Sequence, residues 1–266
     1  MLVRSKEAEF GKPLLGIVAA FREEVKDYLK GGDFRVVARE GPLRFHQSTL
    51  NPDVVVTEGS FGQQGAQEGT RQLVERYGPD FIVSAGFAGG VQAGLRPGDL
   101  LLCSRLMWID GPAALWHSNA ASERPVSYPA LWDKLIKDED SNQIYRSCGC
   151  LSVPQLIMSS SMKAWIGATF PVSIVDMESY WVSETAAQYG IPHMVVRTVL
   201  DPVEQTLPPF VAIATGETGG KRWKQAARYM VAKPGHLPKL IQLATQARVA
   251  RASLARFLAT VSSKKG

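Results

Sequence analysis

The sequence contains little cysteine. Its 266 residues include three, Cys103, Cys148 and Cys150, and two of these stand in a Cys-Gly-Cys run. An odd number in this arrangement excludes a dense disulfide framework and favours a reducing compartment. No further ligands stand at a spacing that would complete a metal site around Cys148 and Cys150, so we predict no metal.

Long apolar runs are also missing. No segment approaches the roughly 18 apolar residues that a membrane-spanning helix needs, and residues 1–13 lack the apolar core of a secretory signal. We therefore expect a cytoplasmic protein. A composition of 45% hydrophobic and 21% charged residues is typical of a globular protein, and the length predicts one domain over residues 1–266.

Acidic residues are absent from the end of the chain. From Lys221 onward there are eleven Lys and Arg and no Asp or Glu, which leaves nineteen basic and twenty-five acidic residues before it. Apolar residues at helical spacing, with arginines among them, predict a basic amphipathic helix over residues 234–262. Such a helix either packs on the body of the protein or docks on an anionic membrane surface at the inner membrane face, and both interpretations stay open. We predict no nucleic-acid partner.

Short apolar runs alternate with helical patterns along most of the chain. This order predicts an α/β protein with a mainly parallel sheet covered by helices on both faces. In such sheets ligands bind at the carboxyl ends of the strands. The predicted strands are residues 14–20, 54–57, 81–84, 100–103, 174–176 and 193–200. The glycines of residues 59–65 are spaced as GxxGxxG, which does not match the dinucleotide-binding fingerprint.

Three carboxylates follow predicted strands. Glu24 comes after the first strand, Glu178 after the strand at 174–176, and Asp201 ends the strand at 193–200. Cleavage of a glycosidic bond passes through an oxocarbenium-like state and needs an acid for the leaving group, an acceptor for the sugar hydroxyls and an activated nucleophile. Three acids meeting at one edge of the sheet would supply these roles.

Several segments resemble one enzyme superfamily. GIVAAFREEV (16–25), the stretch from Gly59 through SAGFAGG to RPGDLLL, VDMES (175–179) and IPHMVVRTVLD (191–201) are similar to the purine nucleoside phosphorylase and methylthioadenosine nucleosidase superfamily. The DPVEQTLPP run (201–209) and the tail at 233–258 resemble the hopanoid-associated nucleosidases. The resemblance implies a three-layer α/β/α nucleoside phosphorylase-like fold with a central mixed, mainly parallel sheet, no cofactor, and a homodimer.

The resemblance also implies roles for individual residues. Asp201 stands where the family places the acid that protonates N7 of the purine. Met177 and Glu178 stand at the ribose contact, and Glu24 stands at the carboxylate that activates water, with Glu23 as the alternative after a one-residue shift. Ile157 and Met158 fall near the segment that packs against the base.

Departures from the phosphorylase pattern favour hydrolysis. Where phosphorylases use an arginine and a serine to hold phosphate, Ser84 and Phe87 stand beside Gly86 in the substrate-binding glycine motif. A phenyl ring cannot replace a hydroxyl donor, and loss of a guanidinium removes the strongest anion contact. A carboxylate at Glu24 would also repel a phosphate dianion.

The sequence therefore predicts a nucleosidase. We expect hydrolysis of a 5′-substituted adenosine, with adenosylhopane as the preferred, lipid-linked substrate. One alternative is phosphorolysis, with Arg44 or Arg105 holding phosphate. Others are a methylthioadenosine, S-adenosylhomocysteine or futalosine-type nucleosidase and a non-catalytic nucleoside- or lipid-binding module. We expect His117 to lie at the surface and His193 to be structural.

Overall fold

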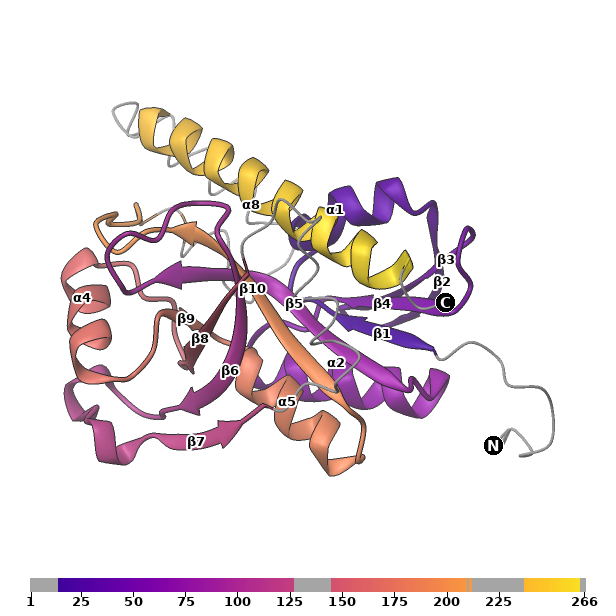
Figure 1. Cartoon of the computed structure of the whole chain (residues 1–266), viewed down its shortest axis with the longest axis horizontal. Helices are drawn as coiled ribbons and strands as arrows, with labels where there is room; N and C mark the ends of the chain where they lie inside the picture. The colour runs from indigo at the N-terminus through magenta and orange to yellow at the C-terminus, as the bar shows by residue number, and fades with distance from the viewer. Residues whose placement is uncertain (1–13, 127–144, 210, 212–236, 264–266) are drawn as a thin grey trace.

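The fold is that of a computed structural model, which describes residues 14–126, 145–209, 211 and 237–263. Strands make up the centre of the molecule (Figure 1). Within the described residues they are β1 (Leu15–Val18), β2 (Phe34–Glu40), β3 (Leu43–Ser48), β4 (Val54–Glu58), β5 (Phe81–Gly90), β6 (Leu100–Trp108), β7 (Ser122–Pro125), β8 (Tyr145–Ser152), β9 (Ile174–Asp176) and β10 (His193–Asp201).

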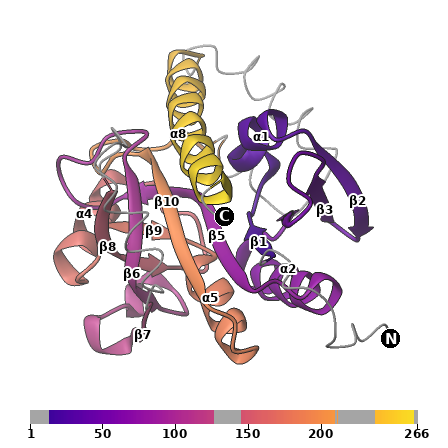
Figure 2. The same cartoon turned by 45° about the vertical axis from the view of Figure 1, so that its right-hand side comes forward.

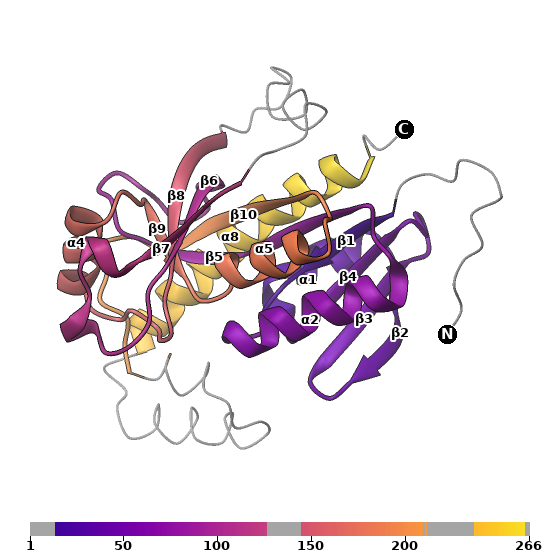
Figure 3. The ribbon, with the colours of Figure 1, turned by 90° about the horizontal axis from the view of Figure 1, so that it is seen from below.

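Helices flank this sheet or cap its end. The described helices are α1 (Arg22–Gly31), α2 (Gly62–Tyr77), η1 (Ala113–Leu115), η2 (Ser118–Ala120), α4 (Ser160–Thr169), α5 (Ser179–Gln188) and α8 (Leu237–Ser263). Helices α1 and α8 lie side by side on one face of the sheet (Figure 2). Helices α2 and α5 pack together on the opposite face (Figure 3). The predicted three-layer α/β/α arrangement is confirmed.

The sheet is mixed. Its centre, β4–β1–β5–β10, is parallel throughout. Antiparallel pairs join β2 to β3, β3 to β4, β10 to β6, β6 to β7 and β5 to β9. Strand β5 pairs with β10, β10 with β6, β6 with β8, β8 with β9, and β9 again with β5. These five strands therefore form a closed ring, and the carboxyl ends of β5, β9 and β10 meet within it.

Successive side chains of the central strands enter two different cores. In β4, Val54 and Val56 pack with α1 and α8, whereas Val55 packs with α2 and α5. This alternation follows from the two-residue period of a strand. Because both faces are covered, the strand is apolar at every one of these positions, which is the pattern that made it recognisable in the sequence.

Helix α8 divides into two parts. The predicted helix at 234–262 is observed from Leu237, and residues 234–236 lie outside the described residues. Leu254, Phe257 and Leu258 are buried in the core that α8 shares with α1 and β10, whereas Ile241 nearer the start of the helix is 59% exposed. The second half is therefore buried in the core, whereas the first half packs on the body only through its partly buried side, where Leu240 and Leu243 lie against Leu207 and Val211. None of the helices in the described ranges is long and apolar enough to span a membrane.

Candidate active site

The carboxyl ends of β5, β9 and β10 carry the centre of the site. On β5, Gly89 is paired with Val175 of β9 on one side and with Asp201 of β10 on the other. A carbon atom at the Cβ position of Gly89 would lie 3.3 Å from the Val175 side chain and 3.6 Å from Oδ2 of Asp201. These distances place the Asp201 carboxylate beside the end of β5, and the peptide that continues from Val175 leads directly to Met177 and Glu178.

Glu24 lies in the first turn of α1, directly after β1. Its Oε2 accepts a hydrogen bond from the backbone N–H of Phe21 (2.9 Å), the residue that caps the helix, and its Oε1 accepts one from the N–H of Phe87 on β5 (2.8 Å). The side chain is 4% exposed. Burial raises the pKa of the Glu24 carboxyl above its usual value, while the two N–H donors oppose that effect. A buried carboxylate held in this way is oriented and a stronger base than usual.

Glu23, the alternative to Glu24, lies on the surface. Its side chain is 61% exposed and pairs with Lys26 and with Arg251 of α8. The structure therefore turns Glu24, and not its neighbour, toward the strand ends.

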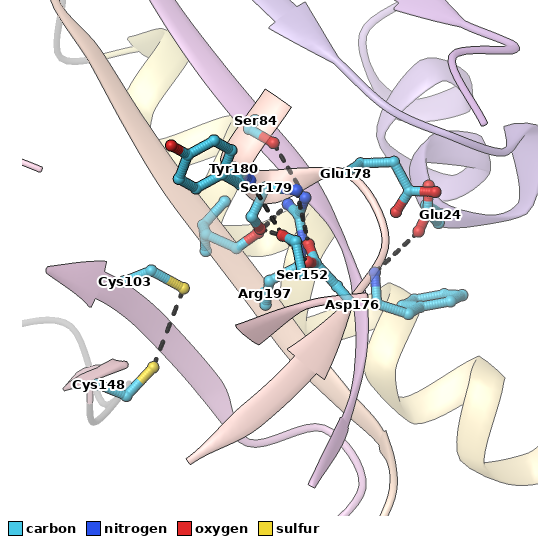
Figure 4. A network of polar contacts seen from close by, with 12 residues as sticks. Glu24, Ser84, Cys103, Cys148, Ser152, Asp176, Glu178, Ser179, Tyr180 and Arg197 are labelled. Atoms are coloured by element: carbon cyan, nitrogen blue, oxygen red, sulfur yellow. Dashed lines mark hydrogen bonds and ion pairs between the residues drawn. The ribbon is translucent and has the colours of Figure 1, made fainter. Parts of the chain in front are cut away.

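Glu178 is the residue at which α5 begins. Its Oε1 accepts a hydrogen bond from the backbone N–H of Gly62 at the start of α2 (2.9 Å). Figure 4 shows the carboxyl groups of Glu178 and Glu24 facing one another. Burial, and then the negative charges of Asp176 and Glu24, raise the pKa of Glu178 to about 8. The Glu178 carboxyl group therefore favours its protonated form at neutral pH.

Asp201 is buried beside a lysine. Oδ2 of Asp201 lies 2.6 Å from Nζ of Lys163 on α4, whose side chain is fully buried. Burial raises the pKa of Asp201 to about 6, although the Lys163 ammonium opposes the rise. An acid with a pKa near neutrality is suited to give and regain a proton during turnover.

A second polar network lies behind Glu178 (Figure 4). Nε of the buried Arg197 donates to Oδ2 of Asp176 (2.8 Å), and its Nη2 donates to Oγ of Ser84 (3.0 Å). Asp176 also accepts hydrogen bonds from the hydroxyl groups of Ser152 and Ser179. Such full pairing is what a buried guanidinium requires, and it fixes the end of β9 next to the site.

The glycine motif contacts charged side chains of the protein. Ser84 is 1% exposed and its hydroxyl is engaged by Arg197. Phe87 presents its backbone N–H to Glu24, and the Cβ position of Gly86 is 2.7 Å from Oε1 of the same carboxylate. In the structure these three residues organise charged side chains of the protein; contact with a substrate stays a prediction.

A cavity of about 750 Å³ adjoins the site. One part of its lining is aromatic and apolar, with Phe21, Phe61, Trp108, Met177 and Trp181, and another part is polar, with Gln63, Gln64, Glu68 and Asp110. Met177 therefore lies where the cavity meets the Glu178 carboxyl group. Ile157 is buried in the core around β8, and Met158 packs in a small cluster with Leu207 and with Leu240 of α8.

The alternative phosphate ligands face carboxylates instead. Nη1 of Arg44 is 3.7 Å from Oε1 of Glu58, and Nε of Arg105 is 3.0 Å from Oε1 of Glu123. Both guanidinium groups are thus already near a negative charge.

The two histidines lie as predicted. His117 is exposed at the surface, and His193 shares a hydrogen bond with the Ser183 hydroxyl (2.7 Å) at the start of β10. Among the described residues no group of three or more His, Cys, Asp or Glu is arranged to hold a metal, and the three cysteines are buried free thiols.

Three buried charged residues of the site were not predicted: Lys163, Asp176 and Arg197. Lys163 does leave a signal in the sequence, because it is the one charged residue in the ten-residue segment Ser160–Thr169. A lone charge in such a segment indicates either a solvent-facing position or a buried partner, and only the fold distinguishes the two.

Comparison with known proteins identifies the family. Residues 14–232 match the model of the phosphorylase superfamily. The chain belongs to this superfamily. The match covers all the strands of the described residues and the three carboxylates, and it agrees with the resemblance seen in the sequence.

Curated relatives and solved structures agree with this assignment. The 5′-methylthioadenosine/S-adenosylhomocysteine nucleosidase of Staphylococcus epidermidis is 26% identical over 196 residues, which cover 71% of this chain and 86% of that protein. The Helicobacter pylori enzyme of the same name superimposes with a TM-score of 0.71 at 19% identity, covering 95% of this chain and 99% of the other. The futalosine hydrolase of Helicobacter pylori gives a TM-score of 0.71 at 17% identity, covering 95% and 98%.

Proposed function

We propose that this N-glycosyl hydrolase releases adenine from a 5′-substituted adenosine, with water as the nucleophile. The observation that carries the proposal is the meeting of Glu24 and Glu178 from distant parts of the sequence, close to the strand ends where Asp201 lies. Burial changes the acidity of all three groups in the direction that acid–base chemistry near neutral pH requires.

Asp201 is assigned to the leaving base. Its carboxyl proton passes to N7 of the purine while the C1′–N9 bond breaks and its electron pair goes to the base. A pKa of about 6 leaves part of the Asp201 population protonated at neutral pH. Proton transfer from a positioned acid of this kind contributes about 10²- to 10⁴-fold to a rate.

Glu24 and Glu178 are assigned to the sugar side. Glu24 takes a proton from the water that attacks C1′, and burial makes its carboxylate a better base for this step. Glu178 accepts hydrogen bonds from the 2′ and 3′ hydroxyl groups, with Met177 against the ribose. The backbone N–H groups of Phe87 and Gly62 hold the two carboxyl groups in place.

The polar contacts support water over phosphate. The buried Arg197 is engaged by Asp176 and Ser84, and the N–H of Phe87 is engaged by Glu24. A phosphate dianion beside Glu24 would be repelled by the carboxylate. It would also find these donors already engaged by groups of the protein.

Adenine release tests this choice. The wild-type protein, with 5′-methylthioadenosine, is expected to release adenine equally in phosphate-free buffer and with added phosphate. Glu24→Gln is expected to lose most of this activity. The matched control is Glu23→Gln, which makes the same change at the exposed neighbouring residue. Release that requires phosphate would establish phosphorolysis, and no release of adenine from either 5′-methylthioadenosine or adenosylhopane would favour a binding module.

The 5′ group is assigned from the shape of the cavity. Aromatic walls formed by Phe21, Phe61, Trp108 and Trp181, within about 750 Å³, support a large apolar substituent. We therefore propose adenosylhopane as substrate, with a role in hopanoid lipid biosynthesis. Comparison of kcat/KM for adenosylhopane, 5′-methylthioadenosine, S-adenosylhomocysteine and futalosine tests this choice. A preference for any of the last three would replace the hopanoid by that substrate.

Access to a lipid-linked substrate is assigned to the first half of α8. Ile241 and Val249 are exposed there beside Lys239 and Arg248, and the described part of the helix contains no acidic residue. This face supports peripheral contact with the anionic inner membrane face by a cytoplasmic protein. Flotation with phosphatidylglycerol vesicles should be lost in Lys239→Glu/Arg248→Glu, and binding equal to wild type would exclude this face.

A homodimer is proposed from the family resemblance. Sedimentation equilibrium at micromolar concentration should give twice the chain mass of 29.0 kDa. A mass of one chain would contradict it without affecting the assignment of the reaction.

A further inference from the structure

Lys163 is buried in a way that needs an explanation. It lies in the first turn of α4, where Ser159 caps the helix and accepts a hydrogen bond from the N–H of Met162. Its side chain is 0% exposed. Nζ donates to Oδ2 of Asp201 (2.6 Å) and to the backbone carbonyl of Pro202 (2.8 Å). Lysine is almost never fully buried unless it is paired. Here both partners of the ammonium belong to the segment Asp201–Pro202 at the end of β10.

The surroundings of Asp201 are otherwise uncharged in the described part of the chain. Strand β5 presents Gly89 to the carboxyl group, β9 presents Val175, and the chain after β10 presents the backbone of Pro202. The group that opposes the effect of burial on the pKa of Asp201 is Lys163. The ionisation of Asp201 is therefore governed by one charged neighbour, from an element that contributes none of the predicted catalytic residues.

We propose that Lys163 is a positioning residue that stabilises the Asp201 carboxylate formed when the purine is protonated. The inference rests on the proposed function. Before transfer Asp201 is a neutral acid; its proton moves to N7, the C1′–N9 bond breaks, and a carboxylate remains 2.6 Å from the ammonium. Lys163 keeps its own protons throughout. Because the charge on Asp201 grows only as the bond breaks, the ammonium stabilises the transition state more than the ground state.

The contact geometry assigns different tasks to the two carboxyl oxygens. Lys163 holds Oδ2, so Oδ1 is the oxygen that faces the base. The second hydrogen bond, to Pro202, ties the ammonium to the same turn that carries Asp201. Movement of that turn therefore carries the lysine with the acid, and their separation is preserved.

The test is the pH dependence of kcat/KM for adenine release from 5′-methylthioadenosine by the full chain. In wild type the activity should fall as pH rises through the pKa of Asp201, because the proton is then lost. Lys163→Met removes the ammonium, so this fall should move to higher pH by at least about one unit, with kcat about 10- to 100-fold lower. Lys163→Arg keeps the positive charge and should return the fall toward the wild-type pH.

A double-mutant cycle separates this role from simple support of the fold. In an Asp201→Asn background there is no carboxylate to stabilise, so adding Lys163→Met should lower kcat no further. This double variant also removes the buried unpaired carboxyl group that Lys163→Met alone would leave, so it retains a route to folding. A structural role predicts instead that the two losses multiply.

The outcomes distinguish the two proposals. The role of Lys163 would be overturned if kcat/KM of Lys163→Met fell at the same pH as in wild type, or if the losses in kcat of the two single variants multiplied in the double variant. Either result would leave the proposed function intact. If Lys163→Met does not fold, Lys163→Arg gives the test. A fall in its kcat/KM that lies more than about one pH unit from the wild-type fall would count against the role in the same way. Absence of adenine release by wild type at every pH, from adenosylhopane as well as from 5′-methylthioadenosine, would overturn the proposed function, and this inference with it.

Discussion

The Cβ position of Gly86 lies 2.7 Å from Oε1 of Glu24, closer than a carbon and an oxygen can approach without displacement. The carboxylate thus occupies the space that a side chain at position 86 would need. The same oxygen accepts the N–H of the next residue, Phe87. The Glu24 carboxylate, the proposed general base, can therefore take this position only because residue 86 is glycine.

Gly86→Ala is expected to displace the Glu24 carboxylate and to lower kcat for adenine release by about 100-fold, as a shift of about 1 Å at a reacting group does. The measurement is turnover in phosphate-free buffer, with stability followed by urea denaturation. Gly31→Ala is the control, because no atom lies within 4 Å of the Cβ position there. Turnover close to wild type in Gly86→Ala would show that Glu24 is not the base.

Asp201→Asn is expected to lower kcat by about 10²- to 10⁴-fold, because an amide has no carboxyl proton to give to N7. The exposed Glu204, three residues along the chain, provides the control in Glu204→Gln. An Asp201→Asn variant that keeps wild-type turnover would place the acid elsewhere.

Glu178→Gln is expected to stabilise the protein at alkaline pH while it lowers activity. The folded state holds the Glu178 proton up to a pKa of about 8, whereas the unfolded chain loses it near the ordinary value of 4.5. Between these values the folded state binds more protons, so the free energy of unfolding of wild type falls as pH rises through this window. The amide oxygen still accepts the N–H of Gly62 and carries no charge.

Urea denaturation at pH 4.5 and pH 8.5 measures this effect. We expect a gain of roughly 2 kcal/mol for the variant at pH 8.5, reduced by the partial exposure of the side chain, and little change at pH 4.5. The same difference at both pH values would exclude the raised pKa as its cause.

Ser84→Ala is expected to act on stability. Its hydroxyl group accepts a hydrogen bond from Nη2 of the buried Arg197, and the loss of this acceptor leaves a buried N–H without its partner, at a cost of about 1–3 kcal/mol. Urea denaturation measures this loss, with Ser118→Ala at an exposed position as control. If adenine release by Ser84→Ala instead became dependent on phosphate concentration, Ser84 would belong to an anion site.

The strands that were predicted are those whose burial on both faces leaves an apolar run, such as β4 and β10. The hairpin of β2 and β3 was not predicted, because Phe34–Glu40 is an edge strand with charged, partly exposed positions. Strand β8 contains Ser, Gly and Cys where packing against neighbouring strands requires small residues. In both cases the pattern is set by tertiary neighbours and not by local preference.

The glycine motif shows the same limit at the site. Residues 85–90 were interpreted as a segment that follows a strand, but β5 continues to Gly90. Glycine is usually unfavourable in a strand; here Glu24 lies against the Cβ position of Gly86, and Asp201 lies beside that of Gly89. Strand order located the three acids, since each follows an apolar run. The pairing of Lys163 with Asp201 depends on a contact 38 residues apart, which no local pattern contains.

The closed ring of strands has a consequence for how the protein is made. Ser84 of β5 and Arg197 of β10 bond across 113 residues of sequence, and parallel pairings at such separations form slowly because a long loop must first be closed. Glu24, Gly86 and Gly89 leave the ribosome long before Asp201 does. Because β10 pairs with both β5 and β6 and carries Asp201 at its end, the site is complete only when this last strand has joined the sheet.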